Sequence, residues 1–150
     1  MKDSASGTSI FAQARTLNPA VRGEDQAILL LSHASGLPGI VDGHRYLNPD
    51  PPGPVMGEAF IDGELGVLRI LPNGDLLHEG KLVWRFEPGE GYRGDSVGAT
   101  QRHFIECLTR ELPFESGGRE YLEKTFSAVE AAYRSLREKR AIGLSEIVGS

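Results

Sequence analysis

Short apolar segments separated by tight-turn residues fill residues 9–85, and they constrain the fold more than any other feature. "SIFAQART" (9–16) alternates: Ile10, Ala12 and Ala14 oppose Phe11, Gln13 and Arg15, as in a half-buried strand. "EDQAILLLSHAS" (24–35) is a longer apolar run, typical of a strand buried on both faces. "LPGIVDGHRYL" (37–47) predicts a third strand.

Three turn signals divide the segments that follow. Asp62-Gly63 predicts a hairpin within 56–71, "PNGD" (72–75) a second turn, and Glu79-Gly80 a hairpin within 76–86. Such strands should pair antiparallel, because a parallel crossover needs about a dozen or more connecting residues. The proline-rich 49–54 segment is interpreted as a loop between strands.

The period changes near residue 95, where two helices are predicted. A helix from Asp95 carries an apolar stripe, ended by Pro113, that comprises Val97, Gln101, Phe104, Ile105, Leu108 and Leu112. A helix from Arg119 carries a second stripe, comprising Leu122, Phe126, Val129, Ala132, Tyr133 and Leu136. "AIGLSEIV" (141–148) could return to the sheet edge. The expected fold is therefore α+β: a mostly antiparallel open β-sheet with two C-terminal helices packed on one face.

Length and composition set limits on the class of protein. A 150-residue chain with 39% hydrophobic and 25% charged residues suggests one globular domain, expected over 9–150. Residues 1–8 are expected to be disordered or to mark where a longer chain was cut. Cys107 is the only cysteine, and neither a signal peptide nor an apolar run of about 18 residues is present. A cytoplasmic protein without membrane attachment is expected, and a net charge of -5 argues against a nucleic-acid partner.

The sequence carries few signals of chemistry. The four histidines lie on separate predicted elements, so no metal site is expected. No glycine-rich dinucleotide fingerprint or phosphate-binding lysine is present. Asp42 and His44 would suit a hydrolytic dyad, but alternate positions on an exposed strand end explain them equally well, and no oxyanion hole is evident.

One stripe of the helix from Asp95 is open to two interpretations. Ser96, Thr100, His103 and Cys107 align at helical spacing and are mostly small, so a ligand or another backbone could approach closely. Alternatively the stripe touches the sheet or solvent, with His103 hydrogen-bonded and inert.

Three segments together resemble a known family. They are "GEDQAILLLSHASGLPGIVDGHR", "MGEAFIDGELGVLRILPNGDL" and "GDSVGATQRHFIECLTRELPFESGGREYLEKTFSAVEAAYRSLREKRAI". In order and spacing they are similar to the C-terminal domain of the Gfo/Idh/MocA oxidoreductases, the family of glucose–fructose oxidoreductase and inositol dehydrogenase. The resemblance runs from about residue 9 to 147, and the last segment is its most specific part.

The resemblance implies a two-domain enzyme of which this chain supplies one part. In the family an N-terminal Rossmann domain holds NAD or NADP, and the C-terminal domain closes the site for a sugar, cyclitol or related polyol. The family's catalytic lysine lies in a Glu-Lys-Pro motif of the Rossmann domain, and its aspartate and histidine lie just after that domain. This chain has none of these motifs. We therefore assign it no catalytic, cofactor-binding or metal residue, and expect that alone it binds no cofactor and does not transfer hydride.

The resemblance also implies where substrate and partner bind. The segment 92–103 would face the interdomain cleft, which gives six candidate substrate-binding residues: Tyr92, Arg93, Asp95, Thr100, Gln101 and His103. Tyr92 could stack on a sugar, Arg93 or Asp95 could bind hydroxyls, and His103 could form a polar wall. The sheet face is expected to pair with a second copy, as a homodimer or larger assembly. The alternative is a freestanding, non-enzymatic module that dimerises or binds a sugar or another partner.

Overall fold

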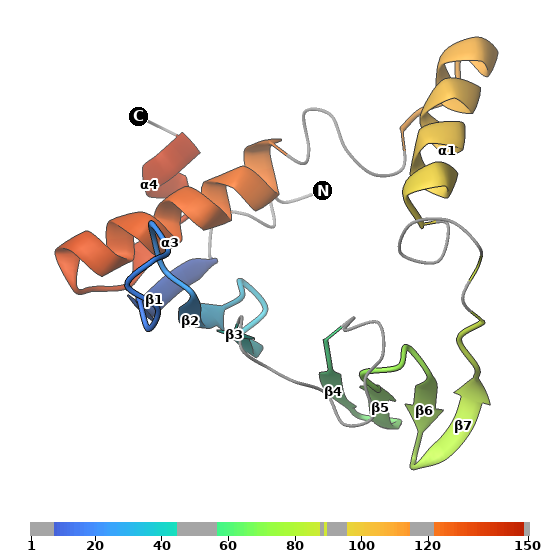
Figure 1. The fold of residues 1–150 in the computed structure, drawn as a ribbon, viewed down its shortest axis with the longest axis horizontal. Coiled ribbons are helices and arrows are strands. Elements are labelled where there is room, and N and C mark those ends of the chain that lie inside the picture. The colour runs from blue at the N-terminus through green and yellow to red at the C-terminus, as the bar shows by residue number, and fades with distance from the viewer. Residues whose placement is uncertain (1–7, 45–56, 88, 90–95, 115–121, 149–150) are drawn as a thin grey trace. The chain divides into compact units, whose positions relative to one another are not determined.

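A computed structural model describes residues 8–44, 57–87, 89, 96–114 and 122–148 (Figure 1). The chain forms two compact units, one from residues 1–46 and 114–150 and the other from residues 47–113. The α+β class is confirmed, with antiparallel sheets followed by helices. Among the described residues, no helix has the length and apolarity that a membrane crossing requires.

The first unit contains a four-stranded antiparallel sheet in the order β3-β2-β1-β8. Its strands are β1 (Ser9–Arg15), β2 (Gln26–Ser32), β3 (Pro38–His44) and β8 (Ile142–Gly143). β8 comes from the "AIGLSEIV" segment and pairs with the edge of β1, as the sequence suggested. A short helix, α4 (Ser145–Val148), follows it.

The second unit contains another four-stranded antiparallel sheet, in the order β4-β5-β6-β7. Its strands are β4 (Ala59–Gly63), β5 (Gly66–Ile70), β6 (Leu76–His78) and β7 (Lys81–Trp84). The sequence pattern did not predict a division into two sheets. Turn residues identify neighbours that are consecutive in the chain, but they carry no information on which hairpins share a sheet.

The hairpin turns follow the backbone requirements of their residues. Glu79 and Gly80 both have positive φ, 50° and 73°, which is the requirement of a type I′ turn, and they connect β6 to β7 as predicted. Gly63 pairs with Gly66, so Glu64 and Leu65 form the turn between β4 and β5. The predicted turn at Asp62-Gly63 is therefore wrong by two residues, because Gly66, with φ 129°, takes the strained backbone position instead.

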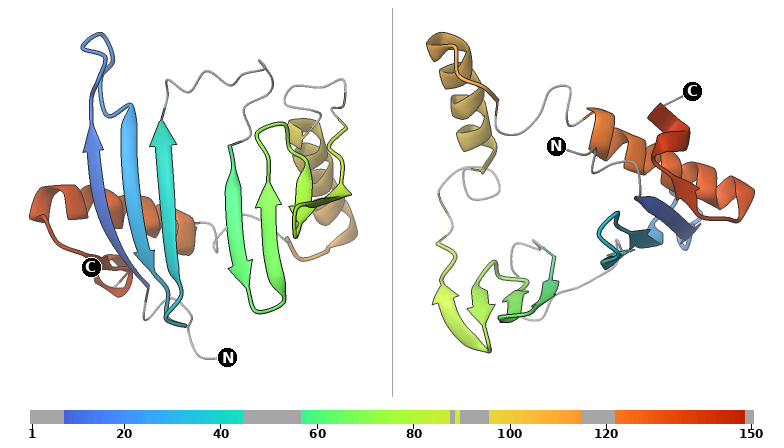
Figure 2. Two further views of the ribbon diagram at one scale, coloured as in Figure 1. Left: turned by 90° about the horizontal axis from the view of Figure 1, so that it is seen from below. Right: turned by 180° about the vertical axis from the view of Figure 1, so that it is seen from behind.

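Small residues bring the long C-terminal helix close to the first sheet. α3 (Ser127–Glu138) follows a π-helical turn at Leu122–Phe126 and packs on β1 (Figure 2). Its buried residues are Ser127, Ala131 and Ser135. The predicted packing stripe of large residues is thus displaced: Phe126, Val129 and Tyr133 are more than 40% exposed. Alanine and serine allow the helix backbone to approach the sheet, and the larger side chains flank the contact.

The core of the first unit lies between this helix and one face of the sheet. Its buried members are Ile10, Ala131, Ile142 and Leu144. Leu29 and Leu31 of β2 pack against this cluster, whereas Ile28 and Leu30 on the opposite face are 40% and 48% exposed. The expectation that β2 is buried on both faces is therefore wrong for this chain, because α3 covers only one face of the sheet.

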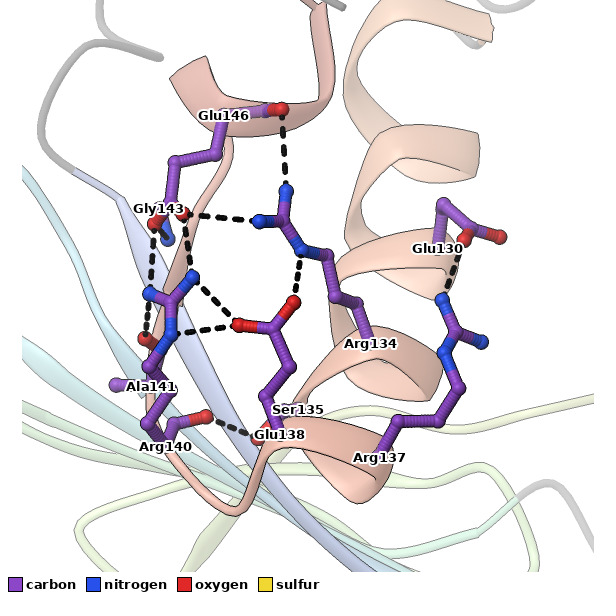
Figure 3. A network of polar contacts seen from close by, with 9 residues as sticks. All are labelled: Glu130, Arg134, Ser135, Arg137, Glu138, Arg140, Ala141, Gly143 and Glu146. Atoms are coloured by element: carbon purple, nitrogen blue, oxygen red, sulfur yellow. Dashed lines mark hydrogen bonds and ion pairs between the residues drawn. The ribbon is translucent and has the colours of Figure 1, made fainter.

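An ion-pair network ties the end of α3 to the residues that follow it (Figure 3). The Arg140 guanidinium donates two hydrogen bonds to the Glu146 carboxylate, at 3.2 and 2.8 Å, and one to Glu138 at 2.7 Å. Arg134 also pairs with Glu138 and Glu146. Glu146 in addition accepts the backbone N–H of Gly143 at 2.9 Å. These contacts hold β8 and α4 beside the helix.

Candidate functional site

Three of the six predicted substrate-binding residues lie on α1 (Ser96–Arg110), the helix expected from Asp95. They are Thr100, Gln101 and His103. The other three, Tyr92, Arg93 and Asp95, lie outside the described residues. The proline-rich 49–54 segment and residues 1–7 also lie outside them.

The helix brings Thr100 and His103 onto one face and places Gln101 on another. At about 100° per residue, positions 100, 103 and 107 share a narrow stripe, whereas 101 falls among the apolar positions. Thr100 is exposed, and its Oγ1 donates to the Ser96 carbonyl oxygen at 2.9 Å, a bond within the same helix. Gln101 is exposed, and His103 is half-buried.

His103 contacts Cys107, one turn further along the helix. The Cys107 sulfur lies 3.5 Å from His103 Nε2 and 3.9 Å from Nδ1. The same thiol donates to the carbonyl oxygen of Pro113 at 3.6 Å. Cys107 is the one buried residue of α1, with 2% of its surface exposed. The polar stripe thus ends in a buried thiol between an imidazole and a backbone carbonyl.

The backbone beyond the helix folds back to make this arrangement possible. Glu111 adopts a left-handed conformation with φ 53°, and the Leu112 N–H donates to the Cys107 carbonyl oxygen at 3.0 Å. These are the features of a Schellman motif. The helix ends at Arg110, before the predicted stop at Pro113, because the left-handed residue ends it first. Pro113 then serves as the acceptor for the thiol.

A concave feature of the first unit was not predicted from the sequence. An apolar pocket of about 160 Å³ lies between α3 and the inner face of the sheet. Its lining residues are Ala12, Ala14, Glu24, Ala27, Leu29, Val129, Ala132, Tyr133 and Leu136. The alternate alanines of "FAQA" in β1 are the signal that could have suggested it, because small side chains on the covered face leave space beneath the helix.

Two polar residues of this pocket contact each other. The Tyr133 hydroxyl donates to the Glu24 carboxylate across 109 residues of sequence. This hydrogen bond lowers the pKa of Glu24 and raises the pKa of Tyr133. The pair joins α3 to the segment that precedes β2, and its polar atoms are the exception in an otherwise apolar lining.

The Glu24-Asp25 pair that precedes β2 has a structural role. Asp25 is buried, and its carboxylate oxygens accept the backbone N–H groups of Leu17 and Asn18 at 2.7 and 2.8 Å. It therefore fixes the turn between β1 and β2. Glu24 beside it bonds Tyr133, so the two carboxylates of this motif organise the first unit.

The pair that the sequence offered as a hydrolytic dyad, Asp42 and His44, lies on β3. Asp42 and His44 occupy alternate positions of β3, opposite Ile28 and Gln26 of β2, as the sequence pattern indicated. In the described parts of the chain, no three histidine, cysteine or acidic side chains are grouped so that they could hold a metal ion.

Known proteins similar to this chain are sugar dehydrogenases and related oxidoreductases. D-apiose dehydrogenase from Paraburkholderia graminis is 32% identical over 93% of this chain and 40% of its own length. D-apiose dehydrogenase from Rhizobium rhizogenes is 29% identical over 93% of this chain and 44% of its own length. A crystal structure of an Agrobacterium radiobacter oxidoreductase in complex with NAD+, L-tartaric acid and magnesium superposes with a TM-score of 0.77. That protein is 26% identical to this chain, and the match covers 93% of this chain and 44% of its own. No protein-family model matches the chain.

These matches extend along nearly the whole chain and agree with the motifs read from the sequence. The fold of this chain is that of the matching part of the Agrobacterium radiobacter oxidoreductase. The matches are consistent with the resemblance of this chain to the C-terminal domain of the Gfo/Idh/MocA oxidoreductases. It spans less than half the length of the curated relatives it matches.

Proposed function

We propose that this chain is the substrate-side and oligomerisation domain of an NAD(P)-dependent oxidoreductase acting on a sugar, cyclitol or related polyol. The observation that carries the proposal is the match to D-apiose dehydrogenases over 93% of this chain but only 40% and 44% of theirs. Those relatives act on a sugar, and the Agrobacterium radiobacter neighbour binds NAD+. The remaining length of the relatives is sufficient for a separate cofactor-binding domain.

In this proposal the chain alone does not transfer hydride. Hydride transfer requires a nicotinamide and a carbinol carbon held together in reactive geometry, so a domain that contributes one wall of the site is not sufficient. We expect a calorimetric titration of the chain with NAD+ or NADP+ to show no binding with a dissociation constant in the micromolar range. Heat of binding in the micromolar range would contradict this division of roles.

The polar stripe of α1 is proposed to face the bound polyol. Thr100 and His103 share that stripe, and with Tyr92, Arg93, Asp95 and Gln101 they form the candidate substrate-binding segment. The imidazole of His103 is partly exposed, so one of its ring nitrogens can form a hydrogen bond with a hydroxyl group of the polyol. The small neighbouring residues permit the polyol to approach the helix closely.

The open face of the first sheet is proposed to bind a second copy of this chain. This face lies opposite α3 and carries Ile28, Leu30 and Ile40 on neighbouring strands, with Phe11 paired to Leu30. Ile40 is 73% exposed and Leu30 48%. Burial of such a patch against an identical patch is a common basis of two-fold interfaces, because the same surface is buried on both copies and every contact between two different residues occurs twice.

Light scattering on charged variants tests this interface. Lysine at Leu30 or Ile40 would place a charge inside the contact, so the variants should shift toward monomer at concentrations where the unmodified chain is dimeric or larger. Leu65→Lys is the matched control, because Leu65 is 94% exposed at a hairpin of the other sheet. An unmodified chain that remains monomeric at high concentration would contradict the proposed interface.

The alternative, a freestanding non-enzymatic module, depends on the same open face, because dimerisation or partner binding would use it without a cofactor domain. The two proposals differ in what completes the chain. Only the oxidoreductase proposal requires that a cofactor-binding domain restore turnover.

A further inference from the structure

The open face of the first sheet is arranged in rows of side chains that cross β1, β2 and β3. The strand register places one residue from each strand in every row. Three successive rows are Phe11–Leu30–Ile40, Gln13–Ile28–Asp42 and Arg15–Gln26–His44. The first row is entirely apolar and the third is entirely polar, so the face changes character along the strands.

This face carries one positive and one negative side chain. Arg15 and Asp42 are the only arginine, lysine or acidic residues of the three strands, and both are exposed. β2 lies between the strands that carry them, so the two charges are not neighbours within one copy. If a second copy covers this face, each charge needs an opposite partner, because an unpaired charge is costly to remove from water.

Arg15 lines a hollow whose chemistry suits a carboxylate. The hollow has a volume of about 240 Å³ and is lined by Gln13, Ala14, Arg15, Gln26 and Ile28. Nε of Arg15 donates a hydrogen bond to Oε1 of Gln26, which holds the guanidinium beside β2. The planar fork of a guanidinium matches the two oxygens of a carboxylate, and the glutamine amides can donate further hydrogen bonds.

Two-fold symmetry decides which carboxylate reaches this hollow. If two copies stack by their open faces about an axis parallel to β2, β1 of one copy lies over β3 of the other and each row meets the same row. Asp42 of the second copy then lies over Gln13, beside Arg15, and the apolar rows cover each other. An axis across the strands that stacked the apolar rows would instead place Asp42 opposite Pro38 and separate it from Arg15.

We propose that the second copy binds with its β3 over β1, so that Asp42 of each copy enters the hollow of the other and pairs with Arg15 there. The use of the open face rests on the proposed function. The inference adds which strands face each other and which charges pair, and the charge complementarity of the face carries it.

Two charge reversals test this pairing. In a homodimer, Arg15→Glu places two carboxylates together at both contacts, and Asp42→Lys places two cations together. Like charges brought together in an interface weaken association strongly, so each variant should raise the dissociation constant of the dimer by roughly 10- to 100-fold. Sedimentation equilibrium at low ionic strength measures this constant.

An equimolar mixture of the two variants gives the decisive result. In the mixed dimer Glu faces Lys at one contact and Asp42 faces Arg15 at the other, so both contacts again join opposite charges. The mixture should therefore dimerise with a dissociation constant within roughly threefold of that of the unmodified chain. Only folded variants can recover on mixing, so misfolding cannot imitate this result.

Glu64→Lys is the matched control, because it changes the net charge as Asp42→Lys does, at an exposed hairpin of the other sheet. It should leave the dissociation constant unchanged, and its mixture with Arg15→Glu should show no recovery.

A mixture of Arg15→Glu and Asp42→Lys without recovery, or single variants that dimerise as tightly as the unmodified chain, would overturn the pairing. If Leu30→Lys still weakened that dimer, the proposed open-face interface would stand. An unmodified chain that stays monomeric would overturn both, so the two failures are distinguishable.

Discussion

The hydroxyl of Ser135 lies 3.0 Å from the backbone nitrogen of Ala12 and accepts its N–H. It donates in turn to the Arg140 carbonyl oxygen at 2.6 Å. β8 pairs with β1 only at Ser9 and Ile10, so beyond them the hydroxyl takes the place of a strand partner for the Ala12 N–H. One fully buried side chain thus connects α3, the first sheet and the residues before β8.

Replacement of Ser135 by alanine tests that connection. The variant leaves a buried donor and a buried acceptor without their partner, which costs about 1–3 kcal/mol. The higher helix propensity of alanine offsets a few tenths of this. We expect the free energy of unfolding in urea to fall by about 1–2 kcal/mol. Ser32→Ala, at an exposed strand end, is the control and should change it by less than about 0.5 kcal/mol. Equal effects of the two substitutions would contradict the account of Ser135.

Two isoleucines distinguish the covered face of the first sheet from its open face. Ile142 is fully buried in the core, whereas Ile40 is 73% exposed. Ile142→Ala should lower the free energy of unfolding by about 2–5 kcal/mol, because a buried cavity adds to the lost transfer energy. Ile40→Ala should cost much less at concentrations where the chain is monomeric. Unfolding of both variants in denaturant measures these changes. A large loss of stability on Ile40→Ala in the monomer would contradict the assignment of Ile40 to the open face of the sheet.

Acid stability should depend on Glu146. The Arg140 guanidinium and the Gly143 N–H lower the pKa of Glu146 from 4.5 to about 2. The unfolded chain binds this proton at a higher pH than the folded chain, so the stabilisation is complete above about pH 4.5 and is lost as the pH falls toward 2. Glu146→Gln should flatten the dependence of unfolding free energy on pH in this window.

Arg140→Gln is the matched variant, because it keeps the Glu146 carboxylate and removes the largest cause of its shifted pKa. It should flatten the same acid dependence. Acid dependence unchanged in both variants would show that the network in Figure 3 does not hold Glu146 as described.

The end of α3 carries a residue that glycine would suit better. Lys139 has φ 58° and ψ 33°, and its N–H donates to the Ser135 carbonyl oxygen. Glycine adopts this left-handed conformation without steric cost, so Lys139→Gly should stabilise the chain by about 0.5–1 kcal/mol. Arg137→Gly, inside the same helix, should destabilise it by about 1 kcal/mol. Thermal unfolding of the two variants should therefore shift in opposite directions, and a shared direction would contradict the assigned cap.

Local signals in the sequence predicted the elements of this fold well. The Glu79-Gly80 pair predicted the turn at which both residues have positive φ. The alternation in "SIFAQART" predicted β1, because side chains of a strand point to opposite faces with a period of two residues. Pairing between consecutive strands also followed, because their connections are short. These features depend on residues close together in the chain.

Features that depend on distant residues were not predictable in the same way. Ser135 and Ala12 are 123 residues apart, and nothing in the spacing of either indicates their hydrogen bond. The apolar stripe of α3 suggested that its large residues pack on the sheet, yet Ala131 and Ser135 do so because only small side chains permit the close approach. Likewise, the aligned stripe of α1 identified His103 and Cys107 as neighbours, but the acceptor at Pro113 became apparent only from the folded turn.

The central claim is that this chain forms the substrate side of an enzyme whose cofactor is held elsewhere. The most direct test is nicotinamide reduction in the presence of D-apiose and a panel of polyols. The chain would be assayed alone and also in a chimera, where it replaces the matching segment of the Paraburkholderia graminis D-apiose dehydrogenase. The account predicts polyol-dependent reduction of NAD+ by the chimera and none by the chain alone. Sustained reduction by the chain alone would contradict it.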